Sequence, residues 1–134
     1  MELERLQKQI LLLEKANRTL NKAFSQEKHS QLEIDWIIQR FEYTIELTWK
    51  TLKKVLEFEG QNNNLFPKEV FKECYKVQLI NNLDIWFNLL EQRNILSHFY
   101  IEHLSEQSFN YIKNNHSIIT ELIENLRNKY LKQA

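Results

Sequence analysis

Apolar residues recur every three or four positions along most of the chain. Near the start they fall at Leu3, Leu6, Ile10, Leu13, Leu20, Ala23 and Phe24, with polar residues between them. This spacing places them along one face of an α-helix. The pattern therefore predicts a first helix from Glu2 to about Phe24.

A second helix is predicted from about Leu32 to Phe58. Ser30 with Glu33 three residues later has the arrangement of a capping box, in which each residue satisfies a backbone amide of the other. Gly60 follows at a place where helices usually end in a left-handed residue. The expected buried stripe of this helix consists of Ile34, Ile37 or Ile38, Phe41, Ile45, Thr48, Leu52 and Val55.

Three more helices fit the rest of the sequence. Pro67 suits the first position of a third helix ending near Leu79, because its missing N–H is not needed there. Asn81 or Asn82 is the expected N-cap of a fourth helix that runs through Leu96. Ser105 is the expected N-cap of a last helix, which passes through Tyr130. The fold predicted is an all-α, antiparallel, up-and-down bundle of about five helices in one domain, residues 1–134.

The amino-acid composition agrees with an all-α fold and restricts the kinds of site and cellular location that the protein can have. The 134 residues include one glycine and one proline, far too few turn-formers for a β-rich fold. Lys plus Arg and Asp plus Glu both number 18, so contact with RNA would need a local basic patch. Cys74, which we expect to be buried, is the single cysteine and excludes an internal disulfide. No apolar run reaches the ~20 residues of a membrane span, and we expect a cytoplasmic protein.

The segment from Arg93 to Tyr100 carries the candidate chemistry. It combines a permanent cation in Arg93, a titratable imidazole in His98 and a phenol in Tyr100. On a helix, Arg93 and His98 would lie about 140° apart, so they do not share one narrow face. Asn94 lies four residues before His98 and could orient the imidazole ring.

These residue types suit metal-free cleavage of RNA, which supplies its own nucleophile in the 2′-hydroxyl. A histidine can move the proton, and an arginine can hold the phosphate and stabilise its transition-state charge. A two-fold dimer would supply a second His98, because one histidine does not easily act as both base and acid. Spacing alone also allows a structural role, with Arg93 paired to a surface carboxylate, His98 capping a helix end and Tyr100 packing at the rim.

The second predicted helix holds two further candidates. Arg40 or Glu42 could line a cleft beside His98. Alternatively, Glu42, Glu46 and Lys50 follow one another at one-turn spacing and could form a surface ladder of ion pairs.

The three tryptophans, Trp36, Trp49 and Trp86, are expected to anchor the core or a dimer interface rather than to stack on bases.

Arg93-x4-His98-x-Tyr100 resembles the R-x4-H-x-Y motif of HEPN proteins, and specifically of the HepT toxins, also called nucleotidyltransferase substrate-binding proteins. The similarity extends from about residue 35 to residue 103. One departure is Gln78, which stands where the family often has a glycine at the end of the third helix. The segments that carry the resemblance are Gln39–Lys53, Glu59-Gly60, Pro67–Val70, Leu79–Asn82 and Trp86.

The resemblance implies a dimeric helical bundle and a ribonuclease toxin that uses Arg93 and His98 without metal or cofactor. It implies a minimal nucleotidyltransferase as antitoxin, which transfers AMP from ATP to Tyr100. A bulky anion so close to His98 would block RNA binding. Transfer RNA is a candidate substrate. The alternative is a non-catalytic substrate-binding subunit of a small nucleotidyltransferase, which suits the zero net charge better.

Overall fold

The computed structural model describes residues 1–26, 29–61, 65–98 and 102–131, with the backbone alone at 97–98 and 102–105. These ranges contain helices and no strand, which confirms the all-α prediction. The elements are α1 (Glu2–Phe24), α2 (Gln31–Phe58), α3 (Pro67–Lys76), α4 (Leu83–His98), α5 (Glu102–Asn115), α6 (Ser117–Leu126) and a short π-helix, η1 (Arg127–Leu131). No helix in the described ranges is both long and apolar enough to cross a membrane.

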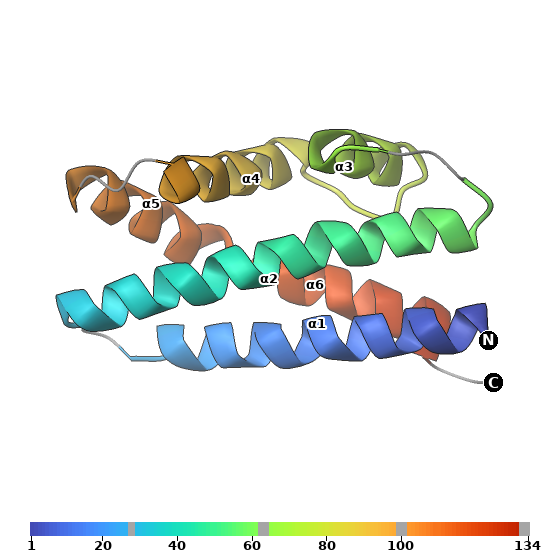
Figure 1. The fold of residues 1–134 in the computed structure, drawn as a ribbon, viewed down its shortest axis with the longest axis horizontal. Coiled ribbons are helices and arrows are strands. Elements are labelled where there is room, and N and C mark those ends of the chain that lie inside the picture. The colour runs from blue at the N-terminus through green and yellow to red at the C-terminus, as the bar shows by residue number, and fades with distance from the viewer. Residues whose placement is uncertain (27–28, 62–64, 99–101, 132–134) are drawn as a thin grey trace.

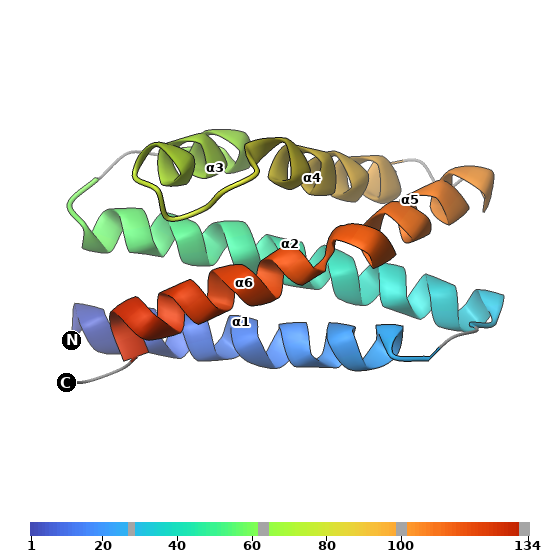
Figure 2. The same ribbon diagram turned by 180° about the vertical axis from the view of Figure 1, so that it is seen from behind.

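The helices form an up-and-down bundle, as predicted. Two of its antiparallel segments each consist of two short helices in succession, α3 with α4 and α5 with α6. α1 and α2 make a long antiparallel hairpin, and α3 and α4 then run back along α2, one after the other (Figure 1). α5 and α6 return in the opposite direction, so that α6 lies beside α1 (Figure 2). This order makes α2 the central helix, in contact with α1, α3, α4 and α5.

The apolar stripe of α2 forms much of the core, as the sequence indicates. Ile37 and Ile38 are both buried, while Ile34 is half-buried. The threonines of α2 are fully buried, and their hydroxyls donate to backbone carbonyls one turn earlier, which satisfies them inside their own helix. The other buried residues of the stripe are Phe41, Ile45, Thr48, Leu52 and Val55.

The predicted ends of α2 and the start of α3 are confirmed. The Oγ of Ser30 accepts from the amide of Glu33 at 3.1 Å, and the amide of Ser30 donates to Glu33 Oε1 at 3.0 Å. Gly60 follows α2 with φ of +95°, a conformation that residues with a side chain rarely adopt. Pro67 opens α3.

The third helix ends at Lys76, earlier than the predicted Leu79. Gln78 takes a left-handed φ of 63°, and the amide of Leu79 donates back to the carbonyl of Cys74 at 2.9 Å. This turn closes a helix, and it usually uses glycine. Asn82 directly precedes α4, and its carbonyl accepts from the amide of Trp86 at 3.3 Å. Its φ of 56° differs from the extended backbone of most N-caps.

The prediction for the last helix is wrong in two respects. Ser105 lies inside α5, which begins at Glu102, and is not an N-cap. Serine is favoured at caps but also tolerated within helices, and the sequence does not separate these cases. The helix is also interrupted at His116, whose ring stacks on Phe24 of α1 with the centroids 4.4 Å apart.

A few polar bonds join the helices across the bundle. The Nδ2 of Asn17 donates to Thr120 Oγ1 at 2.9 Å, and Asn17 is only 4% exposed. Near the other end of α1, Gln7 Nε2 donates to the carbonyl of Tyr130 at 2.8 Å. The hydroxyl of Tyr130 donates to Glu59 Oε1 at 2.6 Å, which connects η1 to the end of α2.

The tryptophans and the cysteine divide between core and surface. Cys74 and Trp86 are buried, as expected, and Trp86 stacks on Phe71 with the centroids 5.2 Å apart. Trp49 is half-buried against the core. Trp36 is 47% exposed and is therefore no part of the core.

Candidate functional site

Arg93 lies on α4 and reaches toward α2. Its Nη2 forms an ion pair with Glu46 Oε1 of α2. Its Nη1 donates to Asn94 Oδ1 at 2.7 Å. The guanidinium is thus held from two sides, while about a quarter of the side chain remains exposed. Asn94 therefore orients Arg93, while the contact with His98 expected from the sequence involves a side chain outside the described residues.

A groove with a volume of about 430 Å³ opens beside Arg93. The lining residues from α2 share one face of that helix, because residues three or four positions apart lie on the same side. Arg93 contributes the wall on α4. The residues that line the groove from α2 are Gln39, Glu42, Tyr43, Glu46, Leu47 and Lys50.

The charges in this groove balance. Lys50 Nζ lies 3.8 Å from Glu46 Oε2, so Glu46 is shared between Lys50 and Arg93. The one-turn ion pair expected from the sequence is therefore present, with Arg93 as an additional partner. Partial burial raises the pKa of the Glu42 carboxyl, and the positive charge of Arg93 offsets part of that increase.

Arg40 lies next to the groove rather than in its wall. Its guanidinium carbon is 5.1 Å from the ring centroid of Tyr43, which does line the groove. A cation in this position is attracted by the negative face of the aromatic ring. Arg40 therefore acts on the groove through Tyr43.

His98 is the last residue of α4, five residues after Arg93. Its side chain and the whole of Tyr100 lie outside the described residues. Arg93, Asn94 and Glu42 are thus brought together at the groove, and Arg40 is close to them. His98 is connected to them through the backbone of α4.

Residues 5–128 match the family described as nucleotidyltransferase substrate binding protein like. The chain belongs to this family. A similar solved structure is the crystal structure of ttk003001694 from Thermus thermophilus, at 29% identity and a TM-score of 0.79. The alignment covers 86% of this chain and 98% of that one, and no curated protein matches.

Membership of the nucleotidyltransferase substrate-binding-like family confirms the resemblance seen in the sequence and implies association with a nucleotidyltransferase. The residue that sequence reasoning missed is Glu46, which was grouped only with Glu42 and Lys50. Two carboxylates at one-turn spacing, followed one turn later by Lys50, were the available signal. Their nearness to Arg93 depends on how α2 packs against α4.

The groove offers no evident metal site. Among the described residues, no three histidine, cysteine, aspartate or glutamate side chains gather closely enough to hold an ion. Its two carboxylates face cations instead: Glu46 pairs with Arg93 and Lys50, and Glu42 feels the charge of Arg93. The groups present can bind a phosphate and a polar chain.

Proposed function

We propose that this protein is a metal-independent endoribonuclease that uses Arg93 and His98, and that a partner nucleotidyltransferase silences it by adding AMP to Tyr100. The observation that carries the proposal is the placement of Arg93 in an open groove, oriented by Glu46 and Asn94. A planar guanidinium held in this way is suited to bind a phosphate with two parallel hydrogen bonds.

The reaction requires few groups from the protein. The 2′-oxygen of RNA attacks the adjacent phosphorus, the bond from phosphorus to the 5′-oxygen breaks, and a 2′,3′-cyclic phosphate forms. His98 takes the proton from the 2′-hydroxyl or gives one to the leaving 5′-oxygen. Arg93 stabilises the additional negative charge of the transition state. A two-fold dimer would bring a second His98 for the other proton transfer.

Substrate binding must compete with Glu46. In the free protein the carboxylate of Glu46 occupies the side of Arg93 that a phosphate would use. Exchange of the carboxylate for a phosphate keeps an anion beside Arg93 and leaves its guanidinium hydrogen-bonded. Glu46 therefore keeps Arg93 oriented without preventing its use.

Addition of AMP to Tyr100 would stop this cleavage reaction. Tyr100 follows His98 by two residues, so an added nucleotide would be near the proton-transfer group. The negative phosphodiester would repel the RNA backbone and occupy space beside His98.

A second candidate is a non-catalytic substrate-binding subunit of a nucleotidyltransferase. The balanced charge of the groove favours it, because Glu46 already neutralises Arg93 and no excess of cations attracts RNA. This candidate predicts a stable complex with a small nucleotidyltransferase and no effect on RNA.

The test compares the wild-type chain with His98→Ala and Arg93→Met in a purified RNA-cleavage assay that contains EDTA. Arg18→Met is the matched control, because Arg18 is exposed on α1 and lies outside the groove. We expect cleavage by wild type and by Arg18→Met, and at least a 100-fold loss in the other two variants at unchanged helix content. Intact RNA with all four proteins would favour the non-catalytic subunit.

Tyr100 is tested separately. Incubation with the partner nucleotidyltransferase and ATP should add the mass of one or more AMP groups to wild type and suppress its RNA cleavage. Tyr100→Phe should gain no mass and keep its activity. Addition of AMP to Tyr100→Phe at the same level would show that another residue is the acceptor.

A further inference from the structure

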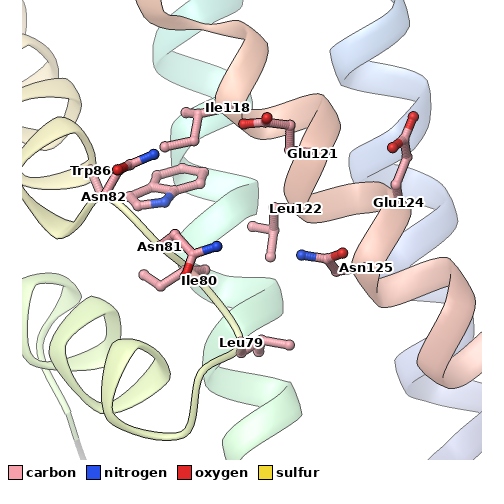
Figure 3. Close-up of a pocket in the computed structure, with 10 residues that line it drawn as sticks. All are labelled: Leu79, Ile80, Asn81, Asn82, Trp86, Ile118, Glu121, Leu122, Glu124 and Asn125. Atoms are coloured by element: carbon pink, nitrogen blue, oxygen red, sulfur yellow. The ribbon is translucent and has the colours of Figure 1, made fainter.

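A second pocket lies between the loop that precedes α4 and helix α6 (Figure 3). Its volume is about 320 Å³, and it shares no lining residue with the Arg93 groove. That volume falls at the lower end of the range of small-molecule sites, roughly 300–1,000 Å³. The pocket therefore has room for a ligand of modest size.

Trp86 gives this pocket an unused hydrogen-bond donor. The side chain is 1% exposed, and its indole Nε1 has no hydrogen-bond partner within the described parts of the chain. Stacking on Phe71 fixes the plane of the ring. A buried N–H without an acceptor is unfavourable, so this position calls for a group that supplies one.

Polar side chains surround the indole. Figure 3 shows the amides of Asn81 and Asn82 on the two sides of the Trp86 ring, with Glu121 on the facing helix. Apolar contact comes from Ile118 and Leu122, which are both buried. The pocket thus combines a donor, a carboxylate acceptor and amides that can do either, next to an apolar wall.

The charge of the pocket restricts the ligand further. Glu121 and Glu124 are among its lining residues, and none of the lining residues is a lysine or arginine. A phosphate would be repelled by the carboxylates and would find no cation. The ligand that fits must bring a hydrogen-bond acceptor for Trp86 and a donor for a carboxylate, and must itself be uncharged at this end.

We propose that this pocket binds an amino-bearing nucleobase, as adenine or cytosine would present it. A ring nitrogen accepts from the N–H of Trp86, and the neighbouring exocyclic amino group donates to Glu121. The apolar wall of Ile118 and Leu122 packs against the base. Unsubstituted purine keeps the ring nitrogens of adenine but has no amino group, and it leaves the carboxylate without a donor. The base belongs to a free nucleoside or to an RNA strand, and the site is independent of the proposed nuclease chemistry.

The test follows the indole N–H resonance of Trp86 in the ¹⁵N-labelled full chain, assigned by its loss in Trp86→Phe. Adenosine, added up to millimolar concentration, should move this resonance downfield because a hydrogen bond forms at the indole N–H. The change in chemical shift should reach a plateau as the site fills. Purine riboside, which differs from adenosine only in lacking the amino group, should bind at least fivefold more weakly, which is the ratio expected for one lost hydrogen bond. No movement of the Trp86 resonance with either nucleoside would overturn the proposal.

Glu121→Ala should weaken adenosine binding about fivefold. Glu106→Ala is the matched control, since Glu106 is exposed on α5 and outside the pocket, and it should leave the affinity unchanged. Equal affinity of both variants would refute the role of Glu121 and with it the amino-group preference.

One further ligand, a short adenine oligonucleotide, separates the possible sources of the base. Tighter binding of adenosine than of a short adenine oligonucleotide, through repulsion of phosphates by Glu121 and Glu124, would assign the site to a free nucleoside. Movement of the Trp86 resonance at lower concentration of the oligonucleotide would assign it to an RNA strand.

Discussion

Glu42 is the residue of the groove whose ionisation bears most directly on stability. Burial disfavours its charged form, so the pKa of this carboxyl in the folded protein lies above its ordinary value of 4.5, although Arg93 reduces the increase. The folded state therefore binds the proton more tightly than the unfolded state does. Stability falls as the pH rises through the ordinary pKa and then through the raised one.

Glu42→Gln should accordingly be more stable than wild type at pH ~7, by less than about 1 kcal/mol because the side chain is partly exposed. The difference should vanish below the ordinary pKa of 4.5, where both proteins are neutral at this position. Urea midpoints at the two pH values measure it. Glu91→Gln, at an exposed position of α4, is the control. A less stable variant at neutral pH would mean that the Glu42 carboxylate supports Arg93.

The interruption between α5 and α6 shows what sequence patterns miss at the scale of the element. The signals in Ser30, Gly60 and Pro67 were local, and each marked a helix end correctly. No glycine or proline accompanies the break at His116. Its ring instead meets Phe24, 92 residues away, and this contact forms only after α1 and α6 have packed.

The burial of His116 makes this break sensitive to pH. Desolvation lowers the pKa of its imidazole below 6.5, so folding disfavours the protonated ring. The stability it provides is present above the unfolded pKa of 6.5 and is lost as the pH falls below that value. His116→Phe keeps a ring against Phe24 and removes the titration.

Wild type should therefore lose more thermal stability than His116→Phe when the pH falls from about 7.5 to about 5.5. Melting temperatures followed by circular dichroism at the two pH values give the comparison. The other histidines are common to both proteins and cancel in the difference. Equal losses in the two proteins would show that His116 accepts its proton without disturbing the fold.

The attachment of η1 to the bundle depends on Tyr130. Its hydroxyl donates to Glu59, and burial, together with this acceptor, raises the pKa of the phenol well above its usual range. Tyr130→Phe should keep the edge contact with Phe58 and lower the free energy of unfolding by about 1 kcal/mol. Chemical denaturation measures the loss. Tyr75→Phe, at a half-exposed position, should change little.

At the scale of the molecule, the sequence predicted the class of fold and most of its helices, yet only part of the groove. Arg93, Asn94 and Glu42 were recognised as site candidates, and the structure places them together. The pairing of Arg93 with Glu46 joins residues 47 positions apart. It depends on the packing of α2 against α4, which no local pattern encodes.

Cys74 reports on the integrity of the whole core. It is fully buried, and burial raises the pKa of its thiol from 9.0 to about 12. A shift of about three pH units lowers the thiolate fraction roughly a thousandfold. A thiol reagent such as Ellman's reagent should therefore react with the native protein at least a thousandfold more slowly than with the urea-unfolded chain. A fast reaction under native conditions would reveal local opening of α3.

The bond between Asn17 and Thr120 gives α1 and α6 a preferred alignment. An apolar seam between two helices tolerates a shift by one turn, since leucine and isoleucine side chains fit many neighbours. A shift of α1 along α6 would instead bury the Asn17 amide with no acceptor, at an expense of about 1–3 kcal/mol. The threonines of α2 give no such discrimination, because their hydroxyls bond within their own helix. The amides of Asn17 and Asn21, which both donate to Thr120 Oγ1, thus favour a single arrangement of the two helices among several of similar hydrophobic energy.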